Sequence, residues 1–434
     1  MPITSIRLQN FRCFRDSGEV PIRPLTVIFG RNNAGKSSIL NSLLLLRQTL
    51  DRPEHGERLN MRGPLYPAGA YADIVHRHQS SQNITMEFDV QARFGIHGRI
   101  AMEFCSDEPQ PPLLVRFRVE SPRTSTLEIR RGRGRGGPYE LDVGGETLGG
   151  ERKGNFRFPI NQFLPLIGSE PPRRGRPSLT RDHARRTARV LIQEFEGTLG
   201  GLRAVGAFRQ APVRRYDYQG RPSEAIDLSG ENVVHALIED SMRRGKHRGE
   251  LLASLNEWLK NVGDVRLMPL RRVSPTARLY ELRLKDRDSG RWANFADVGF
   301  GIGQAFPVLV EGLRTPAGGL FIVQEPEIHL HPDAQLAMAD YLVSLSRAGR
   351  RVIAETHSEA LLLRIRKALA SGLLGPKEVS IVHVAGRRDG SSLISQLGMD
   401  ELGQIQGWPE GFMEEVTRER LDLLDKMAAH GGKE

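Results

Sequence analysis

A glycine-rich stretch at residues 30–38, GRNNAGKSS, has the residue types and spacing of a phosphate-binding loop, G-x-x-x-x-G-K-[ST]. In such a loop, backbone N–H groups close around phosphate oxygens, the lysine reaches the terminal phosphates, and the hydroxyl after it can hold Mg²⁺. The stretch therefore predicts a nucleotide phosphate site. The residues expected to line it are Gly30, Asn33, Gly35, Lys36, Ser37 and Ser38.

A second group of polar residues follows an apolar run at residues 320–323, in the stretch GLFIVQEPEIHLHP. Such a run predicts a buried parallel strand, and ligands bind at the carboxyl ends of parallel strands. The first polar residue, at the Walker B position, usually supports Mg²⁺, and the next activates the attacking water. We expect Glu325 to be this base, with Glu327 as the alternative. Gln324 carries no charge and would support the metal through its amide oxygen or a water, so hydrolysis should be slow.

The elements around these motifs predict an α/β fold. An apolar, β-branched run at residues 25–29 precedes the loop, and a leucine-rich stretch without glycine or proline follows it at residues 38–50. Strict alternation of apolar and polar residues at 84–90 and 100–104 predicts half-buried strands of an antiparallel sheet. Further helices are expected at 232–242, 250–260 and 359–370, then a hairpin pairing 379–384 with 391–397, and a closing helix from residue 413.

Composition limits the partners. No apolar run approaches the roughly 20 residues that span a membrane, and two cysteines are too few for a disulfide framework. We therefore expect a cytoplasmic protein without a membrane partner. The net charge of +10 favours polyanions such as DNA, although codon bias toward arginine would produce the same excess. The basic stretches at 130–135 and 173–189 are the candidate contacts to DNA phosphates.

The order of these motifs resembles a known family. IRLQNFRCF at residues 6–14, the phosphate loop, FGIGQ at 300–304, the Walker B stretch and ETHSE at 355–359 resemble the RecF and SMC-like branch of ABC-type ATPases. The resemblance implies an ABC-type P-loop ATPase head split by a compact mixed α/β insertion lobe. The expected domains are residues 1–52 for the first half of the head, 53–291 for the lobe and 292–434 for the second half.

The resemblance also implies roles for further residues. His357 matches the switch histidine that contacts the γ-phosphate, and FGIGQ is similar to the ABC signature LSGGQ, which places Gly301, Gly303 and Gln304 at a nucleotide. A signature of this kind completes the site of a second protomer. ATP, with Mg²⁺, is therefore expected to bring two chains together as a homodimer or a higher homo-oligomer.

Two stretches resemble a narrower group. GAFRQAPVRRYDYQG at 206–220 and GWPEGF at 407–412 are similar to segments of standalone AAA-group ATPases near the OLD and Septu anti-phage systems. Arg209, Arg214 and Arg215 are either sensors or DNA contacts in this interpretation, or else belong to a solvated face or an internal ion pair. The stretch after His357 is too short for the nuclease domain of OLD proteins, so an effector nuclease or other partner protein would act in trans.

Together, these expectations predict a slow ATPase that couples its nucleotide state to DNA or to a partner effector. Its role would be in DNA maintenance or anti-phage defence. The alternatives are a nucleotide-gated scaffold with little or no hydrolysis and the nucleotide-binding subunit of a transporter. The long insertion between the phosphate loop and the signature argues against the transporter.

Overall fold

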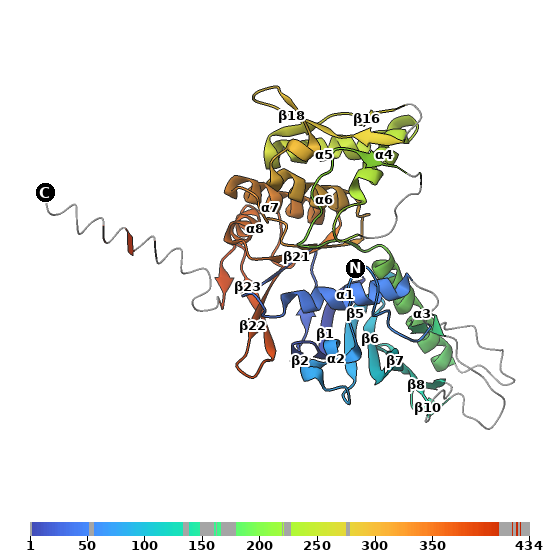
Figure 1. The fold of residues 1–434 in the computed structure, drawn as a ribbon. Helices are drawn as coiled ribbons and strands as arrows, with labels where there is room; N and C mark the ends of the chain where they lie inside the picture. Colours follow the sequence, from blue (N-terminus) through green and yellow to red (C-terminus); the bar gives the residue numbers. More distant parts are fainter. Residues whose placement is uncertain are drawn as a thin grey trace.

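The computed structural model describes residues 2–51, 56–132, 139–147, 160–161, 163–165, 179–218, 220, 227–274 and 278–407, and single residues beyond them. Two large sheets organise these residues (Figure 1). One sheet is antiparallel and the other is mainly parallel. The first helix after the phosphate loop packs between them.

The antiparallel sheet has the order β10-β9-β8-β7-β6-β5-β1-β2, with β3 also paired to β1. Its inward side chains alternate as expected; in β5 every second residue from Ile84 to Val90 is buried. The predicted antiparallel sheet is thus confirmed. Because β1 pairs with β5, this sheet crosses the predicted domain boundary between residues 52 and 53. Its strands are β1 (Ile3–Phe11), β2 (Phe14–Asp16), β3 (Val20–Pro21), β5 (Ile84–Gln91), β6 (His97–Asp107), β7 (Gln110–Ser121), β8 (Thr124–Arg131), β9 (Tyr139–Val143) and β10 (Glu146–Thr147).

The second sheet has the order β13-β20-β21-β4-β22-β23-β24. The pairs from β13 to β22 are parallel, and the last two pairs are antiparallel. The hairpin of β22 and β23 confirms the one predicted from the sequence. Strands of this sheet are β4 (Leu25–Phe29), β13 (Arg203–Val205), β20 (Leu320–Gln324), β21 (Arg351–Thr356), β22 (Val379–Gly386), β23 (Ser392–Met399) and β24 (Ile405–Gln406).

Helices cover both faces of the parallel sheet (Figure 1). Helix α8 has the predicted bounds, and α4 and α5 agree with the two helices predicted in the lobe. The α-helices are α1 (Lys36–Leu50), α2 (Tyr71–Ile74), α3 (Leu179–Gly200), α4 (Val233–Met242), α5 (Glu250–Gly263), α6 (Phe300–Arg314), α7 (Pro332–Arg347) and α8 (Glu359–Ala370). Short 3₁₀ turns are η2 (His76–His78), η3 (Arg93–Gly95), η4 (Gly245–His247) and η5 (Phe295–Asp297).

Three small sheets complete the described part of the chain. They pair β11 with β12, β14 and β16 with β17, and β15 and β19 with β18. Their bounds are β11 (Ile160–Asn161), β12 (Leu164–Pro165), β14 (Tyr216–Asp217), β15 (Val265–Leu267), β16 (Arg271–Arg272), β17 (Leu279–Glu281), β18 (Arg283–Asp286) and β19 (Trp292–Asn294). The predicted closing helix from residue 413 lies outside the described residues.

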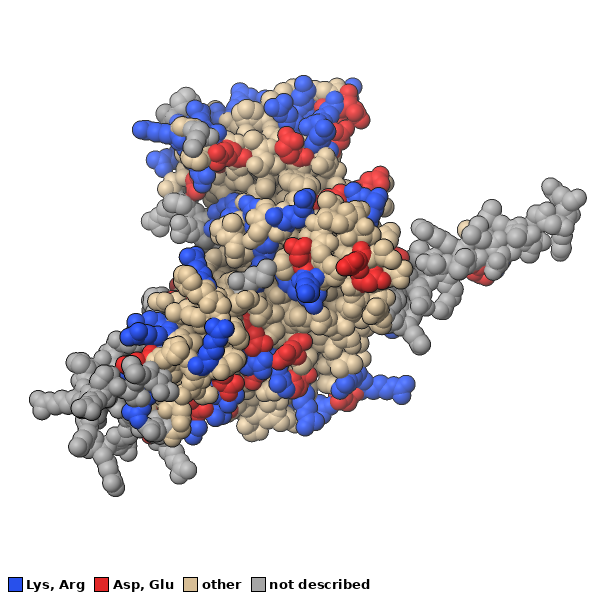
Figure 2. All heavy atoms as spheres, turned by 180° about the vertical axis from the view of Figure 1, so that it is seen from behind, with Lys and Arg blue, Asp and Glu red and all other residues tan. Residues whose placement is uncertain are grey.

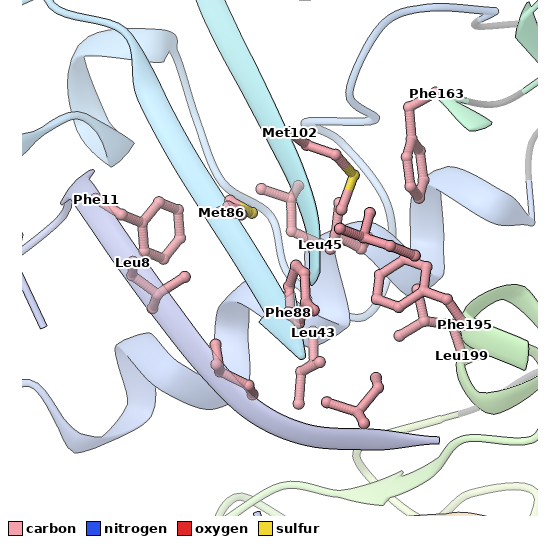
Figure 3. Close-up of a cluster of buried hydrophobic side chains, with 14 of the residues drawn as sticks. Leu8, Phe11, Leu43, Leu45, Met86, Phe88, Met102, Phe163, Phe195 and Leu199 are labelled. Carbon is pink, nitrogen blue, oxygen red and sulfur yellow. The ribbon is translucent and has the colours of Figure 1, made fainter. Parts of the chain in front are cut away.

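Two hydrophobic cores meet at the parallel sheet, one on each face. The first contains α1, whose leucines pack against the antiparallel sheet and α3 (Figure 3). Leu43 and Leu45 lie among Phe88 of β5, Met102 of β6 and Phe195 of α3 (Figure 3). The second core lies between the other face of the sheet and α4–α8. The helix that begins at the phosphate loop is therefore held on its apolar sides by both sheets.

No helix in the described ranges is long and apolar enough to cross a membrane.

Candidate nucleotide site

Three neighbouring parallel strands bring the predicted motifs to one edge of the sheet. Strand β21 lies between β20 and β4, and the register pairs Gln324 with Glu355 and Glu355 with Ile28. All three strands run in the same direction, so their carboxyl ends lie together. The loop after β4, the residues after β20 and the residues after β21 therefore surround one place.

Backbone geometry explains the glycines of the phosphate loop. Gly30 and Gly35 have φ angles of 151° and 97°, a region that side chains disfavour, and Asn33 has a φ of 60°. A Cβ on Gly30 would overlap the carbonyl oxygen of Val384, and one on Gly35 would overlap the sulfur of Cys13. Gly35 is also the residue before the first turn of α1. The loop thus presents its N–H groups at a helix N-terminus, where the helix dipole favours an anion.

Lys36 and the two serines after it begin α1. Lys36 is 4% exposed, and its ammonium donates to the carbonyl oxygen of Arg31 at 3.1 Å, so the side chain folds back over the loop. Burial lowers the pKa of Lys36, and the nearby carboxylates of Glu355 and Glu325 oppose that shift. Ser38 is buried, and its hydroxyl accepts from the thiol of Cys13 at 3.5 Å.

Ser37 leads to a residue that the sequence reasoning did not assign. Its hydroxyl donates to Oε1 of Glu355 at 2.7 Å, and the amide of Gln324 donates to Oε2 of the same carboxylate at 2.9 Å. An ionised carboxylate only accepts, which orients the Gln324 amide with its NH₂ group toward Glu355. Hydroxyl and carboxylate oxygens are ligands that suit Mg²⁺, so the donor set at this edge fits the metal. The sequence contained one sign of this role for Glu355, namely an acidic residue at the end of the apolar run of β21.

Glu325 and His357 face each other at the same edge. Glu325 has a φ of 45°, and its backbone N–H donates to the carbonyl of Glu355 at 2.7 Å. The Nε2 atom of His357 lies 3.8 Å from Oε1 of Glu325, and about a third of each side chain is exposed. A carboxylate and an imidazole that are this close and open to solvent can accept and relay a proton from a water.

Glu327 is placed differently. Its side chain is buried, and its Oε1 accepts from the Thr356 hydroxyl at 2.5 Å, from the N–H of His357 at 3.0 Å and from the N–H of Ser358 at 3.1 Å. Burial raises the pKa of Glu327. The carboxylate thus fixes the backbone turn that carries His357, and it is not open to solvent as Glu325 is.

Arg209 connects the signature-like stretch to the end of β20. The residue is 8% exposed, and burial lowers the pKa of its guanidinium to about 10, so this group stays charged at neutral pH. Four backbone carbonyl oxygens accept from it at 2.6 to 3.0 Å, those of Gly206, Gln304, Gln324 and Glu325. It therefore ties β13 and α6 to the end of β20. Among the predicted alternatives, these contacts are nearest to the internal ion pair. The partners of Arg209 are, however, backbone carbonyls and not an acidic side chain.

The signature-like stretch forms the N-terminus of α6. Gly299 precedes the helix and is exposed. Inside the first turn, a Cβ on Gly301 would lie 2.5 Å from the carbonyl oxygen of His329, and one on Gly303 would lie 2.8 Å from the ring of Pro212. These two glycines therefore allow close packing within the protomer.

Gln304, the last residue of the signature-like stretch, is turned inward. It is 2% exposed, and its side-chain amide donates to the carbonyl oxygen of Arg209 at 3.4 Å. The exposed part of the stretch is thus its beginning, where Gly299 and Phe300 lie.

The predicted basic stretches differ from expectation where they are described. Arg130 and Arg131 belong to β8 and not to a loop. Arg130 pairs with Glu128 of the same strand at 2.5 Å, and Arg131 pairs with Glu57 of a turn at 3.3 Å. Residues 133–138 and 173–178 lie outside the described part. On the face in Figure 2, basic and acidic side chains are interspersed.

The other two arginines of the 206–220 segment are exposed. Arg214 forms an ion pair with Asp297 at 2.6 Å. Arg214 therefore forms an ion pair, as one of the predicted alternatives has it, but this pair lies on the surface and not in the interior.

Comparisons with known proteins identify the family of the chain. A family model described as "AAA ATPase domain" matches residues 1–128, and one described as "AAA domain, putative AbiEii toxin, Type IV TA system" matches residues 144–364, just over half of the chain. The DNA replication and repair protein RecF of Trichlorobacter lovleyi is 30% identical over 134 residues, which are 28% of this chain and 36% of that protein. The chain thus matches only about a third of the length of this relative.

Solved SMC head domains also resemble the chain. The head from Thermotoga maritima has a TM-score of 0.43 and 11% identity, covering 91% of this chain and 98% of its own. An Smc head from Pyrococcus furiosus, solved with the C-terminal domain of ScpA, has a TM-score of 0.45 and 12% identity, covering 99% of this chain and 100% of its own. The matched family models carry the assignment, and they agree with the phosphate loop and the parallel strand order: the chain belongs to this family of AAA-domain ATPases.

Proposed function

We propose that this chain binds ATP with Mg²⁺ at the phosphate loop and hydrolyses it slowly. The observation that carries the proposal is the meeting of Lys36, Ser37, Glu325, Glu355 and His357 at the carboxyl ends of three adjacent strands. Bound Mg²⁺ would neutralise charge on the phosphates, with Ser37 and Gln324 as the predicted residues beside it.

The roles of the remaining residues follow from their exposure and charge. Glu325 accepts the proton of the attacking water, and His357 forms a hydrogen bond with the γ-phosphate. The loop N–H groups and Lys36 bind the phosphate oxygens. Hydrolysis is slow because position 324 carries an amide, which attracts a cation less strongly than a carboxylate does.

The proposed assembly is an ATP-dependent homodimer or higher homo-oligomer. The exposed start of α6 would face the γ-phosphate bound to a second protomer, where a helix N-terminus favours an anion. ATP would then be buried between two chains, and hydrolysis would release them.

The proposed role is to pass this nucleotide state to DNA or to a partner protein such as an effector nuclease, in DNA maintenance or anti-phage defence. The relation to RecF, over a third of its length, and the net charge of +10 support DNA as a partner. Binding of a labelled DNA duplex, measured with and without ATP over a range of salt, tests this role.

Light scattering with ATP and Mg²⁺, together with phosphate release in the same samples, tests the ATPase. Wild type should assemble with ATP and release phosphate slowly, and Lys36→Ala should do neither. Lys377→Ala, which removes an exposed lysine, is the matched control and should behave as wild type. Equal phosphate release by wild type and Lys36→Ala would contradict the proposal.

One observation favours a second candidate, a nucleotide-gated scaffold. The amide of Gln324 donates to Glu355, so the last position of β20 is occupied by a donor group and not by a carboxylate. A scaffold would assemble with ATP in the scattering experiment and release phosphate only at the background rate.

A further inference from the structure

Glu355 is a buried acid whose direct partners carry no charge. It is 4% exposed, and its two oxygens accept from the hydroxyl of Ser37 and the amide of Gln324. Removing a carboxylate from water costs several kcal/mol unless a cation or enough donors compensate it. Two neutral donors and the nearby ammonium of Lys36, which is expected to bind phosphate, compensate in part. A further cation at this place would stabilise the ionised form.

Glu355 lies on the strand next to the one where a metal-supporting carboxylate was expected, at position 324. Gln324 and Glu355 are register partners on β20 and β21, and β21 is the strand that adjoins the phosphate-loop strand β4. The edge of the sheet therefore holds one carboxylate and one amide, with the carboxylate on the neighbouring strand. Through Ser37, this carboxylate is directly connected to the first turn of α1.

We propose that Glu355 takes over from position 324 as the carboxylate that supports nucleotide-bound Mg²⁺. The Ser37 hydroxyl donates a hydrogen bond to Glu355. The lone pairs of the Ser37 oxygen are therefore free for a metal. Glu355 thus orients that hydroxyl and adds a negative charge next to it, as carboxylates do for ligands they contact. The amide of Gln324 holds the other carboxylate oxygen. This inference rests on the proposed function, because it assumes that Mg²⁺ and ATP bind at the loop.

Exchange of the two side chains provides the test. Glu355→Gln removes the charge and keeps the shape, and the double variant Gln324→Glu with Glu355→Gln returns the carboxylate to the other strand. The probe is a fluorescent ATP analogue, whose affinity is measured during a Mg²⁺ titration and again in EDTA. Glu359→Gln, which removes an exposed acid from the first turn of α8, is the matched control. Thermal unfolding checks that each variant is folded.

The expected result is that Glu355→Gln needs about tenfold more Mg²⁺ for half-maximal tightening of nucleotide binding. The double variant should recover most of this loss, and Glu359→Gln should match wild type. Bound Mn²⁺, observed by electron paramagnetic resonance with ATP present, should follow the same order.

The outcomes separate this inference from the proposed function. A wild-type protein that does not bind the ATP analogue contradicts the proposed function itself. If wild type binds it in a Mg²⁺-dependent manner and a folded Glu355→Gln shows the same Mg²⁺ dependence, the role of Glu355 is overturned and the ATPase proposal stands. A loss in Glu359→Gln equal to that in Glu355→Gln would also overturn the role.

Discussion

The carboxylate of Glu327 accepts a hydrogen bond of 2.5 Å from the hydroxyl of Thr356, across the gap between the end of β20 and the end of β21. The same carboxylate oxygen accepts from two backbone N–H groups of the turn that follows, those of His357 and Ser358. One buried side chain thus holds the turn on which the exposed histidine lies.

Replacement of Glu327 should separate this holding role from that of a general base. Glu327→Gln keeps an acceptor oxygen for the three donors, so turnover should fall far less than the about 10²-fold or more that removal of a base costs. Glu327→Ala leaves buried donors unpaired and should lower the free energy of unfolding by about 2–4 kcal/mol. Phosphate release and urea unfolding measure the two effects. A Glu327→Gln protein that is folded but inactive would instead identify Glu327 as the base.

The raised pKa of Glu327 predicts a pH dependence of stability. Burial raises the pKa above the ordinary value of 4.5, so the folded state binds this proton more tightly than the unfolded state does. The stabilisation is fully present below 4.5 and is lost as the pH rises through the raised value. Wild type should therefore gain stability relative to Glu327→Gln as the pH falls through this window. Urea unfolding of both proteins at each pH measures the difference, and a difference that grows with pH would be the wrong sign.

The four carbonyl contacts of Arg209 predict that lysine cannot replace it. A lysine ammonium has three donors on one atom, whereas the guanidinium spreads five over a plane. Arg209→Lys should lower the free energy of unfolding by about 2–4 kcal/mol, because buried carbonyls lose charged donors. Arg215→Lys, on the same segment but exposed, is the control and should be neutral. Equal stability of Arg209→Lys and wild type would show that these contacts contribute little.

The exposed carboxylate of Glu325 predicts a trapped complex. Glu325→Gln keeps the shape of the side chain and removes its ability to take a proton, so phosphate release should fall by about 10²-fold or more. ATP binding should persist, since the phosphate loop is unchanged, and the ATP-dependent assembly should then last longer in light scattering. Glu327→Gln is the control for loss of a neighbouring charge. Turnover by Glu325→Gln at the wild-type rate would exclude Glu325 as the base.

Much of the fold could be predicted because its elements have strong local patterns. Helix α8 begins at a serine cap and continues with helix-forming residues, and the hairpin of β22 and β23 turns at Arg388-Asp389-Gly390. The antiparallel strands alternate strictly. By contrast, β13 has three residues, too few to show any period, and it pairs with β20 although it lies within the predicted lobe.

Parts of the site could not be predicted because they depend on which strands become neighbours. The pairing of Gln324 with Glu355 follows from the register of β20 and β21, which no local pattern encodes. The partners of Arg209 are backbone carbonyls, which every residue possesses, so the sequence contains no sign of them. The glycine at position 301, where LSGGQ has serine, is visible in the sequence, but the close approach of the His329 carbonyl oxygen to it is not.

That contact predicts unequal costs for three substitutions at the start of α6. A Cβ at position 301 would lie 2.5 Å from the carbonyl oxygen of His329, so Gly301→Ala should lower the free energy of unfolding by about 1–3 kcal/mol. A Cβ at Gly299 meets nothing within 4 Å, and its φ of −50° suits any residue. Gly299→Ala and Gly299→Val should therefore keep the stability of wild type within about 0.5 kcal/mol.

The same tolerance makes Gly299 a specific probe of assembly. A valine there projects from the exposed start of α6, so it should block ATP-dependent association if that surface meets the nucleotide of a second protomer. Binding of the ATP analogue to the Gly299→Val monomer should be unchanged, because the phosphate loop lies on another element. Light scattering of Gly299→Val with ATP and Mg²⁺, beside Gly299→Ala, measures this effect. A Gly299→Val protein that assembles as wild type does would place the contact between protomers elsewhere on the molecule.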